Sequence, residues 1–207
     1  MRETGHERQP IGKQRMEALS DGIYAIALTL LVLDLKVPSL PSGASEQALQ
    51  QALLALLPKV STWLSSFWIM SLSWLAQQRL YALCVALDRA MIWTELAQLA
   101  VISLIPFTTA LAGAYRTHPT VAVIYGAQFL VAMLLSYVRT NHLLKTPALH
   151  SPDLTPRISS RLRLRMRVLI GCAAVTTALA FVFPRWSTLG MLPAVLPSDL
   201  WSNRRAA

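Results

Sequence analysis

The sequence has few charged residues and almost no cysteine. Only 14% of its 207 residues are Asp, Glu, Lys or Arg, whereas 54% are hydrophobic. A soluble domain of this length could not bury such long apolar runs, so the composition favours an integral membrane protein. The two cysteines, Cys84 and Cys172, are 88 residues apart, a spacing that does not indicate a metal site.

The residue patterns that enzymes use are also missing. The four histidines have no second histidine or carboxylate at ligand spacing, and no paired Asp-Asp or Ser-His set stands out. We therefore predict no enzyme activity, no metal and no cofactor. The net charge of +9 does not indicate nucleic-acid binding, because the basic residues lie between apolar runs and form no solvated patch.

The chain does contain a series of apolar segments of about 20 residues, the length that crosses a bilayer. They predict an all-α membrane protein with six transmembrane helices. The sixth is interrupted by Pro193 and Pro197, so a re-entrant or interfacial segment is the alternative there. The predicted helices are 16–35, 53–76 (extended by a helical pattern from residue 45), 90–112, 120–137, 164–183 and 186–201.

The distribution of lysine and arginine predicts the orientation of these helices. With the N-terminus in the cytoplasm, the outer segments hold only four of the 19 basic residues, namely Lys36, Lys59, Arg116 and Arg185. Because basic residues are retained on the inner side during insertion, both termini are expected in the cytoplasm. A cleaved signal peptide is disfavoured, since the region before the first apolar run is about twice the usual length and contains acidic residues.

The charged segments then delimit one domain. We expect a single six-span domain over 1–207, with a cytoplasmic tail at 1–14 and a basic cytoplasmic linker at 138–163. The linker contains Arg161 and Arg163 of a run in which arginine alternates with apolar residues as far as Arg167. On a helix this alternation spreads the guanidinium groups around all sides, so it indicates a topology signal or binding of anionic lipid headgroups.

Ionisable and hydroxyl residues occur at the inner end of the first helix. Arg15, Ser20 and Asp21 directly precede the apolar run 23–35. A charge at membrane depth is costly and is therefore a candidate for function. The pattern Arg-x-x-x-Leu-Ser-Asp-Gly over 15–22, followed by 25–34, resembles the first helix of the endosomal and lysosomal potassium channel family in its single-repeat prokaryotic form. Residues 104–109, Leu-Ile-Pro-Phe-Thr-Thr, resemble the third-helix signature of that family, whose proline kinks the helix. The chain departs from the family at Leu19, where an aromatic residue is usual.

Four residues of the first helix fall on one stripe at helical spacing, namely Ile26, Thr29, Leu30 and Leu33. Taken alone, the stripe is a helix seam or a lipid-facing surface, and a membrane threonine usually bonds back to its own helix. The resemblance implies that this helix lines a pore, that Ile26, Leu30 and Leu33 form an apolar constriction, and that Thr29 beside Ile26 contributes to cation preference. Such a pore needs no carbonyl filter, and the chain has no Thr-Val-Gly-Tyr-Gly loop.

Three carboxylates complete the candidate residues. Asp21 lies about 140° from Ile26 around the helix, and the resemblance implies that Arg15, Ser20 and Asp21 tie this helix to others. Asp34, at the outer end, is either compensated by Lys36 or part of a carboxylate ring that concentrates cations at the outer mouth. Glu95 is expected to pair with an arginine at an inner helix end, or to reach a water-filled crevice between the helices.

These features predict a potassium-selective channel. We expect a homotetramer in the plasma membrane of a prokaryote, since one chain cannot enclose a pore with a single lining helix. Its partners would be K⁺, further copies of itself and membrane lipids. The alternatives are a proton-conducting protein or small secondary cation transporter that uses Asp21 and Glu95, and a membrane scaffold without transport.

Overall fold

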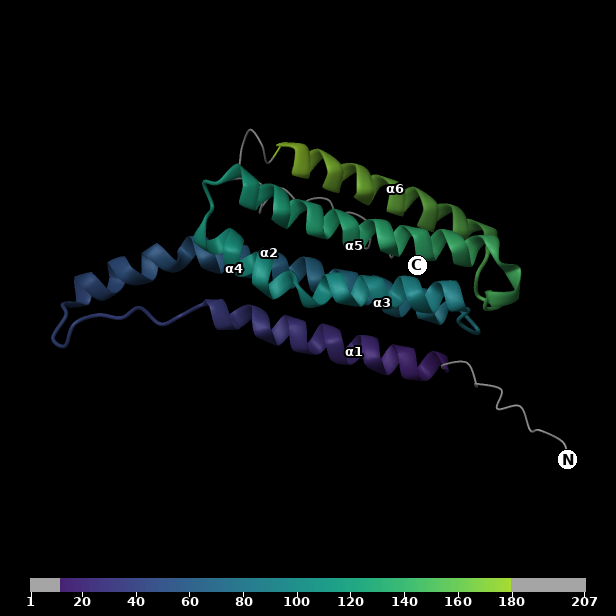
Figure 1. The fold of residues 1–207 in the computed structure, drawn as a ribbon, viewed down its shortest axis with the longest axis horizontal. Coiled ribbons are helices and arrows are strands. Elements are labelled where there is room, and N and C mark those ends of the chain that lie inside the picture. The colour runs from purple at the N-terminus through teal and green to yellow at the C-terminus, as the bar shows by residue number, and fades with distance from the viewer. Residues whose placement is uncertain (1–11, 180–207) are drawn as a thin grey trace, which may run out of the picture.

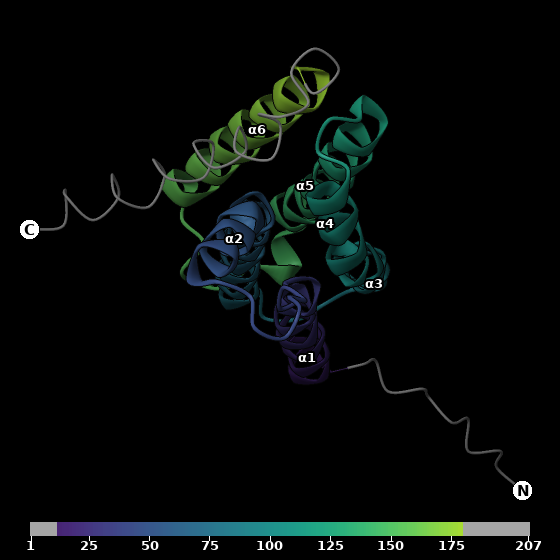
Figure 2. The same ribbon diagram turned by 90° about the vertical axis from the view of Figure 1, so that its left-hand side faces the viewer.

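A computed structural model describes residues 12–179, and this part of the chain is entirely helical apart from its connections. The main helices run roughly side by side, and α1 and α6 lie on opposite sides of the bundle (Figures 1 and 2). The elements are α1 (Lys13–Leu30), the 3-10 turn η1 (Leu31–Asp34), α2 (Glu46–Ala82), α3 (Arg89–Ser103), α4 (Ile105–Ala114), α5 (Pro119–Lys145), the 3-10 turn η2 (Pro147–Leu149) and α6 (Pro156–Leu179).

Four segments within residues 12–179 are long and apolar enough to cross a membrane: Lys13–Asp34, Glu46–Ala82, Arg89–Ala114 and Pro119–Lys145. They overlap the first four predicted spans. The predicted fifth span begins inside α6, which does not reach the same hydropathy because its first half contains five arginines. Residues 180–183 of that span and the whole of the predicted sixth span lie outside the described residues.

Helix α2 is longer than a membrane crossing requires. Its 37 residues correspond to about 55 Å at 1.5 Å per residue, against a hydrocarbon thickness of about 30 Å. Its first turns extend past the ends of the neighbouring helices (Figure 1). Pro58 lies inside the helix, and the Ser61 and Thr62 hydroxyls both donate to its carbonyl, at 2.8 and 3.1 Å. The helix is therefore longer than one membrane crossing by several turns.

The third span is broken where the sequence predicts a kink. Helix α3 ends at Ser103, and α4 begins at Ile105, directly before Pro106. Proline lacks the N–H that would continue the helix, and its ring clashes with the preceding turn. Thr109 then donates a hydrogen bond to Ser66 of α2, which also shares one with Tyr125 of α5. The break thus places α4 against both helices.

The basic ends of the helices gather at one end of the bundle, which we call the basic end. It contains the start of α1, the end of α2, the starts of α3 and α6, and the end of α5 (Figure 1). The predicted linker 138–163 divides here into the end of α5, the connection 146–155 and the start of α6.

Asp88, at the start of α3, has two hydrogen-bond partners at this end of the bundle. Its carboxylate caps α3 by accepting from Met91 N at 2.9 Å and also bonds His142 at 2.5 Å. Partial burial raises the pKa of Asp88, but the hydrogen bonds to His142 and to the backbone of the first turn of α3, together with the charge of His142, bring the pKa below its usual value.

The apolar core lies between α1, α2, α3, α4 and α5 and includes Tyr24, Ile69, Leu99, Ile105 and Phe129. Helix α6 packs mainly on α5. A Cβ on Gly126 of α5 would lie 2.7 Å from the Thr177 hydroxyl of α6, so the close approach of these helices depends on the absence of a side chain at residue 126.

Candidate pore-lining helix and its polar anchor

One face of α1 is buried against the rest of the bundle. The buried residues recur at intervals of three or four and are Met16, Ser20, Tyr24, Ala27 and, in η1, Leu31. This spacing keeps them on one side of a helix, where they contact α2, α3 and α4. Helix α1 is therefore held along its whole length by a single face.

The opposite face of α1 is open and apolar. Ile26, Leu30 and Leu33 are 61%, 43% and 67% exposed, and Thr29 lies among them. The predicted stripe thus lies on the face of α1 opposite its buried residues. Figure 2 shows α1 at the edge of the bundle. Nothing in residues 12–179 of the same chain covers these exposed side chains.

Thr29 makes the backbone contact expected of a membrane threonine. Its hydroxyl donates to the carbonyl of Ile26 at 2.8 Å. A hydroxyl has one proton to donate and two lone pairs that accept. Since the proton is used within the helix, both lone pairs of the exposed oxygen are left for a cation or for water. The back-bond and a contribution to cation preference are therefore compatible.

A buried polar network links the N-terminal half of α1 to three other helices. We call it the polar anchor, and its members are Ser20 (α1), Gln77 (α2), Glu95 (α3) and Arg139 (α5), all at most 3% exposed. Gln77 donates to both Ser20 and Glu95, and the Arg139 guanidinium forms an ion pair with Glu95. The predicted pairing of Glu95 with an arginine is confirmed, and the partner is Arg139.

Asp21 is held by neutral donors at the edge of this network. Its carboxylate accepts from Trp74 Nε1 at 2.8 Å and from Gln78 Nε2 at 2.5 Å, both on α2. Arg15 is exposed and contacts neither Ser20 nor Asp21 in the described part of the chain. The structure therefore brings Ser20 and Asp21 to the same helix, α2, without Arg15.

Sequence reasoning missed the partners of these residues, although two signals were present. Gln77 and Gln78 form a pair of amides directly after an apolar run, where polar side chains need partners. Arg139 precedes the end of α5 by six residues and so lies inside the span, but it was counted among the topology signals. Neither signal identifies which residue is the partner.

Replacing Asp21 with alanine should destabilise the assembled protein by about 1 kcal/mol, because Trp74 and Gln78 would lose their shared acceptor at an exposed site. The matched control is Asp21→Asn, which keeps one acceptor oxygen. The thermal unfolding midpoint in detergent should fall clearly for the alanine variant and less for the asparagine variant. An Asp21→Ala protein that assembles normally but has altered ion preference would place Asp21 in the permeation path instead.

Asp34 ends the η1 turn close to α4. Its Oδ2 would lie 3.3 Å from a Cβ on Gly113, beside the Lys59 side chain. It forms no ion pair with Lys36 among the described residues, although their backbones are bonded at 3.0 Å. A side chain at residue 113 would therefore crowd the Asp34 carboxylate at the end of η1.

Comparisons with known proteins agree on one family. The family model described as the endosomal/lysosomal potassium channel TMEM175 matches residues 15–106. A potassium channel of Streptomyces collinus is 32% identical over 175 residues, which are 81% of this chain and 82% of the relative. A potassium channel of Chamaesiphon minutus is 35% identical over 58% of this chain and 61% of its own. The human endosomal/lysosomal proton channel TMEM175 is 33% identical over 54% of this chain and 23% of its own length.

The fold matches a solved structure of the same family. The crystal structure of a lysosomal potassium-selective channel TMEM175 homolog from Chamaesiphon minutus superimposes with a TM-score of 0.76 and 28% identity, over 94% of this chain and 98% of the other. The resemblance predicted from residues 15–34 and 104–109 is therefore confirmed. The chain belongs to the family of the endosomal/lysosomal potassium channel TMEM175, a family of ion channels and not of enzymes.

Proposed function

We propose that the chain is a subunit of a homotetrameric, potassium-selective channel whose pore is lined by the open face of α1. The observation that carries the proposal is the two-sided character of α1: one face is buried and held by the polar anchor, and the other exposes an apolar stripe containing one hydroxyl, Thr29. The relatives named potassium channels support it. A single lining helix cannot enclose a pore, so several copies must contribute.

In such an assembly each residue of the stripe forms a ring. Rings of Ile26, Leu30 and Leu33 would make a narrow apolar constriction. Such a constriction dewets and so opposes the passage of ions. A ring of Thr29 oxygens, beside the Ile26 ring, would replace part of the hydration shell of K⁺. Asp34 would place carboxylates at the outer mouth, where they concentrate cations.

The arrangement in the membrane follows from the basic end. We place this end in the cytoplasm of a prokaryote, in the plasma membrane, with six spans and both termini inside. The fifth and sixth spans would be completed by residues beyond 179. Surrounding lipids contact the exposed apolar residues of the outer helices.

The alternative of a proton-conducting protein or secondary transporter needs carboxylates that change partner or protonation during transport. Glu95 is ion-paired with Arg139, and Asp21 accepts two hydrogen bonds from α2. Both carboxylates therefore have structural partners, which favours the channel.

Recording in planar bilayers under opposed K⁺ and Na⁺ gradients tests the function. A potassium channel gives unitary currents with a reversal potential close to that of K⁺. Saturable flux without unitary events would indicate a carrier, and a reversal potential that follows a pH gradient would indicate proton conduction. A protein that assembles but shows neither unitary currents nor flux would be a membrane scaffold.

Replacing Thr29 with valine should lower K⁺ preference over Na⁺ several-fold without disturbing assembly, since the two side chains are nearly isosteric and only the oxygen is lost. Leu30→Ala is the matched comparison, because it widens the apolar constriction and should change conductance more than preference. The reversal potential and the unitary conductance of both variants measure the difference. An unaltered reversal potential in Thr29→Val would mean that this hydroxyl bonds only its own helix.

A further inference from the structure

Helix α6 exposes one continuous row of residues, which we call the outer stripe. Its members recur at alternating intervals of four and three, a spacing that keeps them on one side of a helix. They are Arg157, Arg161, Leu164, Val168, Gly171 and Val175, and all six are exposed. The three apolar side chains are 65%, 53% and 58% exposed, so the outer stripe is open well into the second half of the helix.

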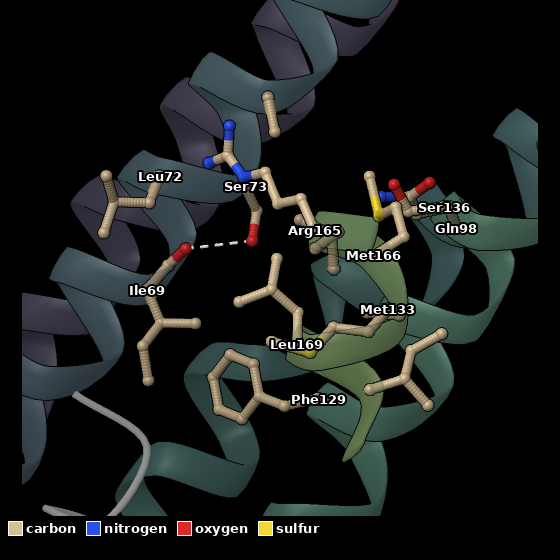
Figure 3. Close-up of a pocket in the computed structure, with 14 residues that line it drawn as sticks. Ile69, Leu72, Ser73, Gln98, Phe129, Met133, Ser136, Arg165, Met166 and Leu169 are labelled. Carbon is tan, nitrogen blue, oxygen red and sulfur yellow. Dashed lines mark hydrogen bonds between the residues drawn. The ribbon is translucent and has the colours of Figure 1, made fainter. Parts of the chain in front are cut away.

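The opposite side of α6 packs on the bundle. Met166 and Leu169 line a cavity between α6 and the neighbouring helices, together with Ile69 of α2 and Phe129 of α5 (Figure 3). Met166 follows Leu164 by two residues, which is about 200° around the helix. The outer stripe therefore faces away from the helices that α6 covers.

The chemistry of the outer stripe changes along the helix. It begins with two arginines and continues with apolar residues, and the change falls between Arg161 and Leu164, about 4.5 Å apart along the axis. The apolar part then continues to Val175, over a further 16 Å or so. In a membrane, an apolar face of this length contacts acyl chains, which places Arg161 and Arg157 at the level of the lipid headgroups.

The arginines of the outer stripe have no acidic partner in the described part of the chain. Helix α6 contains no aspartate or glutamate, and neither Arg157 nor Arg161 forms an ion pair within residues 12–179. A soluble polyanion would satisfy the guanidinium groups but not the apolar residues that follow them. A phospholipid presents a phosphate and then an acyl chain, in the order in which the outer stripe presents arginine and then leucine and valine.

We propose that the outer stripe binds an anionic phospholipid of the leaflet that meets the basic end. Its phosphate would lie at Arg157 and Arg161, and an acyl chain along Leu164 and Val168. Arginine suits this role because its planar guanidinium donates two parallel hydrogen bonds to a phosphate. Since α6 and α1 lie on opposite sides of the bundle, lipid binding can be tested independently of conduction (Figures 1 and 2).

Native mass spectrometry of the full chain, delipidated in detergent and titrated with phosphatidylglycerol or phosphatidylcholine of the same acyl chains, tests the site. We expect the wild type to bind phosphatidylglycerol at least tenfold more tightly than phosphatidylcholine. The double variant Arg157→Gln with Arg161→Gln should reduce this preference to less than threefold. The control is Arg15→Gln, which removes an exposed arginine at the same end of the bundle but on α1, and it should change the preference less than twofold.

A second pair of variants tests the position directly after the arginines. Leu164→Asp adds a carboxylate beside the phosphate and should weaken phosphatidylglycerol binding at least fivefold. Leu19→Asp makes the same change at an exposed position of α1, four residues after Arg15, and should weaken it less than twofold. All variants are first checked for the same elution volume and helicity, and the leucine pair decides if the double arginine variant does not fold.

Three results would overturn the proposal. They are equal affinity of the wild type for the two lipids, equal losses from the α6 and α1 variants, and no phosphatidylglycerol bound to the wild type. The last would mean that residues beyond 179 or another copy of the chain cover the outer stripe.

Discussion

Replacing Arg139 with methionine should destabilise the folded protein by about 3–5 kcal/mol, the largest loss expected of any single substitution in this chain. The change leaves the Glu95 carboxylate buried at 1% exposure without its cation. It also removes a donor at 3.2 Å from the amide oxygen of Gln77, the residue that contacts Ser20 of α1. A substitution on α5 should therefore loosen α1.

The thermal unfolding midpoint and the fraction that elutes as the assembled protein measure this effect. The control is the double variant Glu95→Leu with Arg139→Met, which removes both charges. Because a buried ion pair can be replaced by apolar residues of similar volume with little loss, the double variant should recover most of the stability. Equal damage in the single and double variants would mean that Gln77 and packing, not the charge of Glu95, account for the loss.

Replacing Ile26 with asparagine should raise the unitary conductance about tenfold, which corresponds to about 1.4 kcal/mol removed from the barrier in the pore. The physical reason is that an apolar ring repels water and opposes the entry of a hydrated ion, whereas an amide ring retains water. Ile26 is 61% exposed on α1, so a polar side chain there leaves the core of the subunit unchanged.

Two control variants distinguish the effect of the position on conductance from the effect of the amide side chain. Ile26→Val keeps an apolar ring and should conduct much like the wild type. Leu64→Asn adds the same amide at an exposed position of α2, away from the stripe, and should leave the conductance unchanged. A folded Ile26→Asn channel with wild-type currents would mean that the constriction lies at another residue of α1.

Several features of the molecule could be predicted because they depend only on residues that are near in sequence. The stripe of Ile26, Thr29, Leu30 and Leu33 follows from the helical repeat, and the break before Pro106 follows from the missing amide proton. The first four spans follow from the length of their apolar runs. In each case the physical cause lies within a few turns of one helix.

Other features were less accessible to sequence reasoning. An arginine was expected for Glu95, but the candidates at inner helix ends were equivalent in sequence, and Arg139 became the partner because α5 packs beside α3. The expected participation of Arg15 depended on which way a long side chain points at the helix start, and in the structure it is exposed. Asp21 was expected to tie α1 to other helices together with Arg15, and it does so through hydrogen bonds from Trp74 and Gln78.

The sequence by itself determined that this is a helical membrane protein of a particular channel family and that α1 has one polar-anchored side and one apolar stripe. The tertiary structure alone decided which side chains complete the polar anchor and which side of α6 stays exposed. The physical reason is that hydropathy and helical periodicity belong to a single segment. A buried ion pair or the exposed side of a helix depends on several helices, and their register and facing residues are set only when the helices pack.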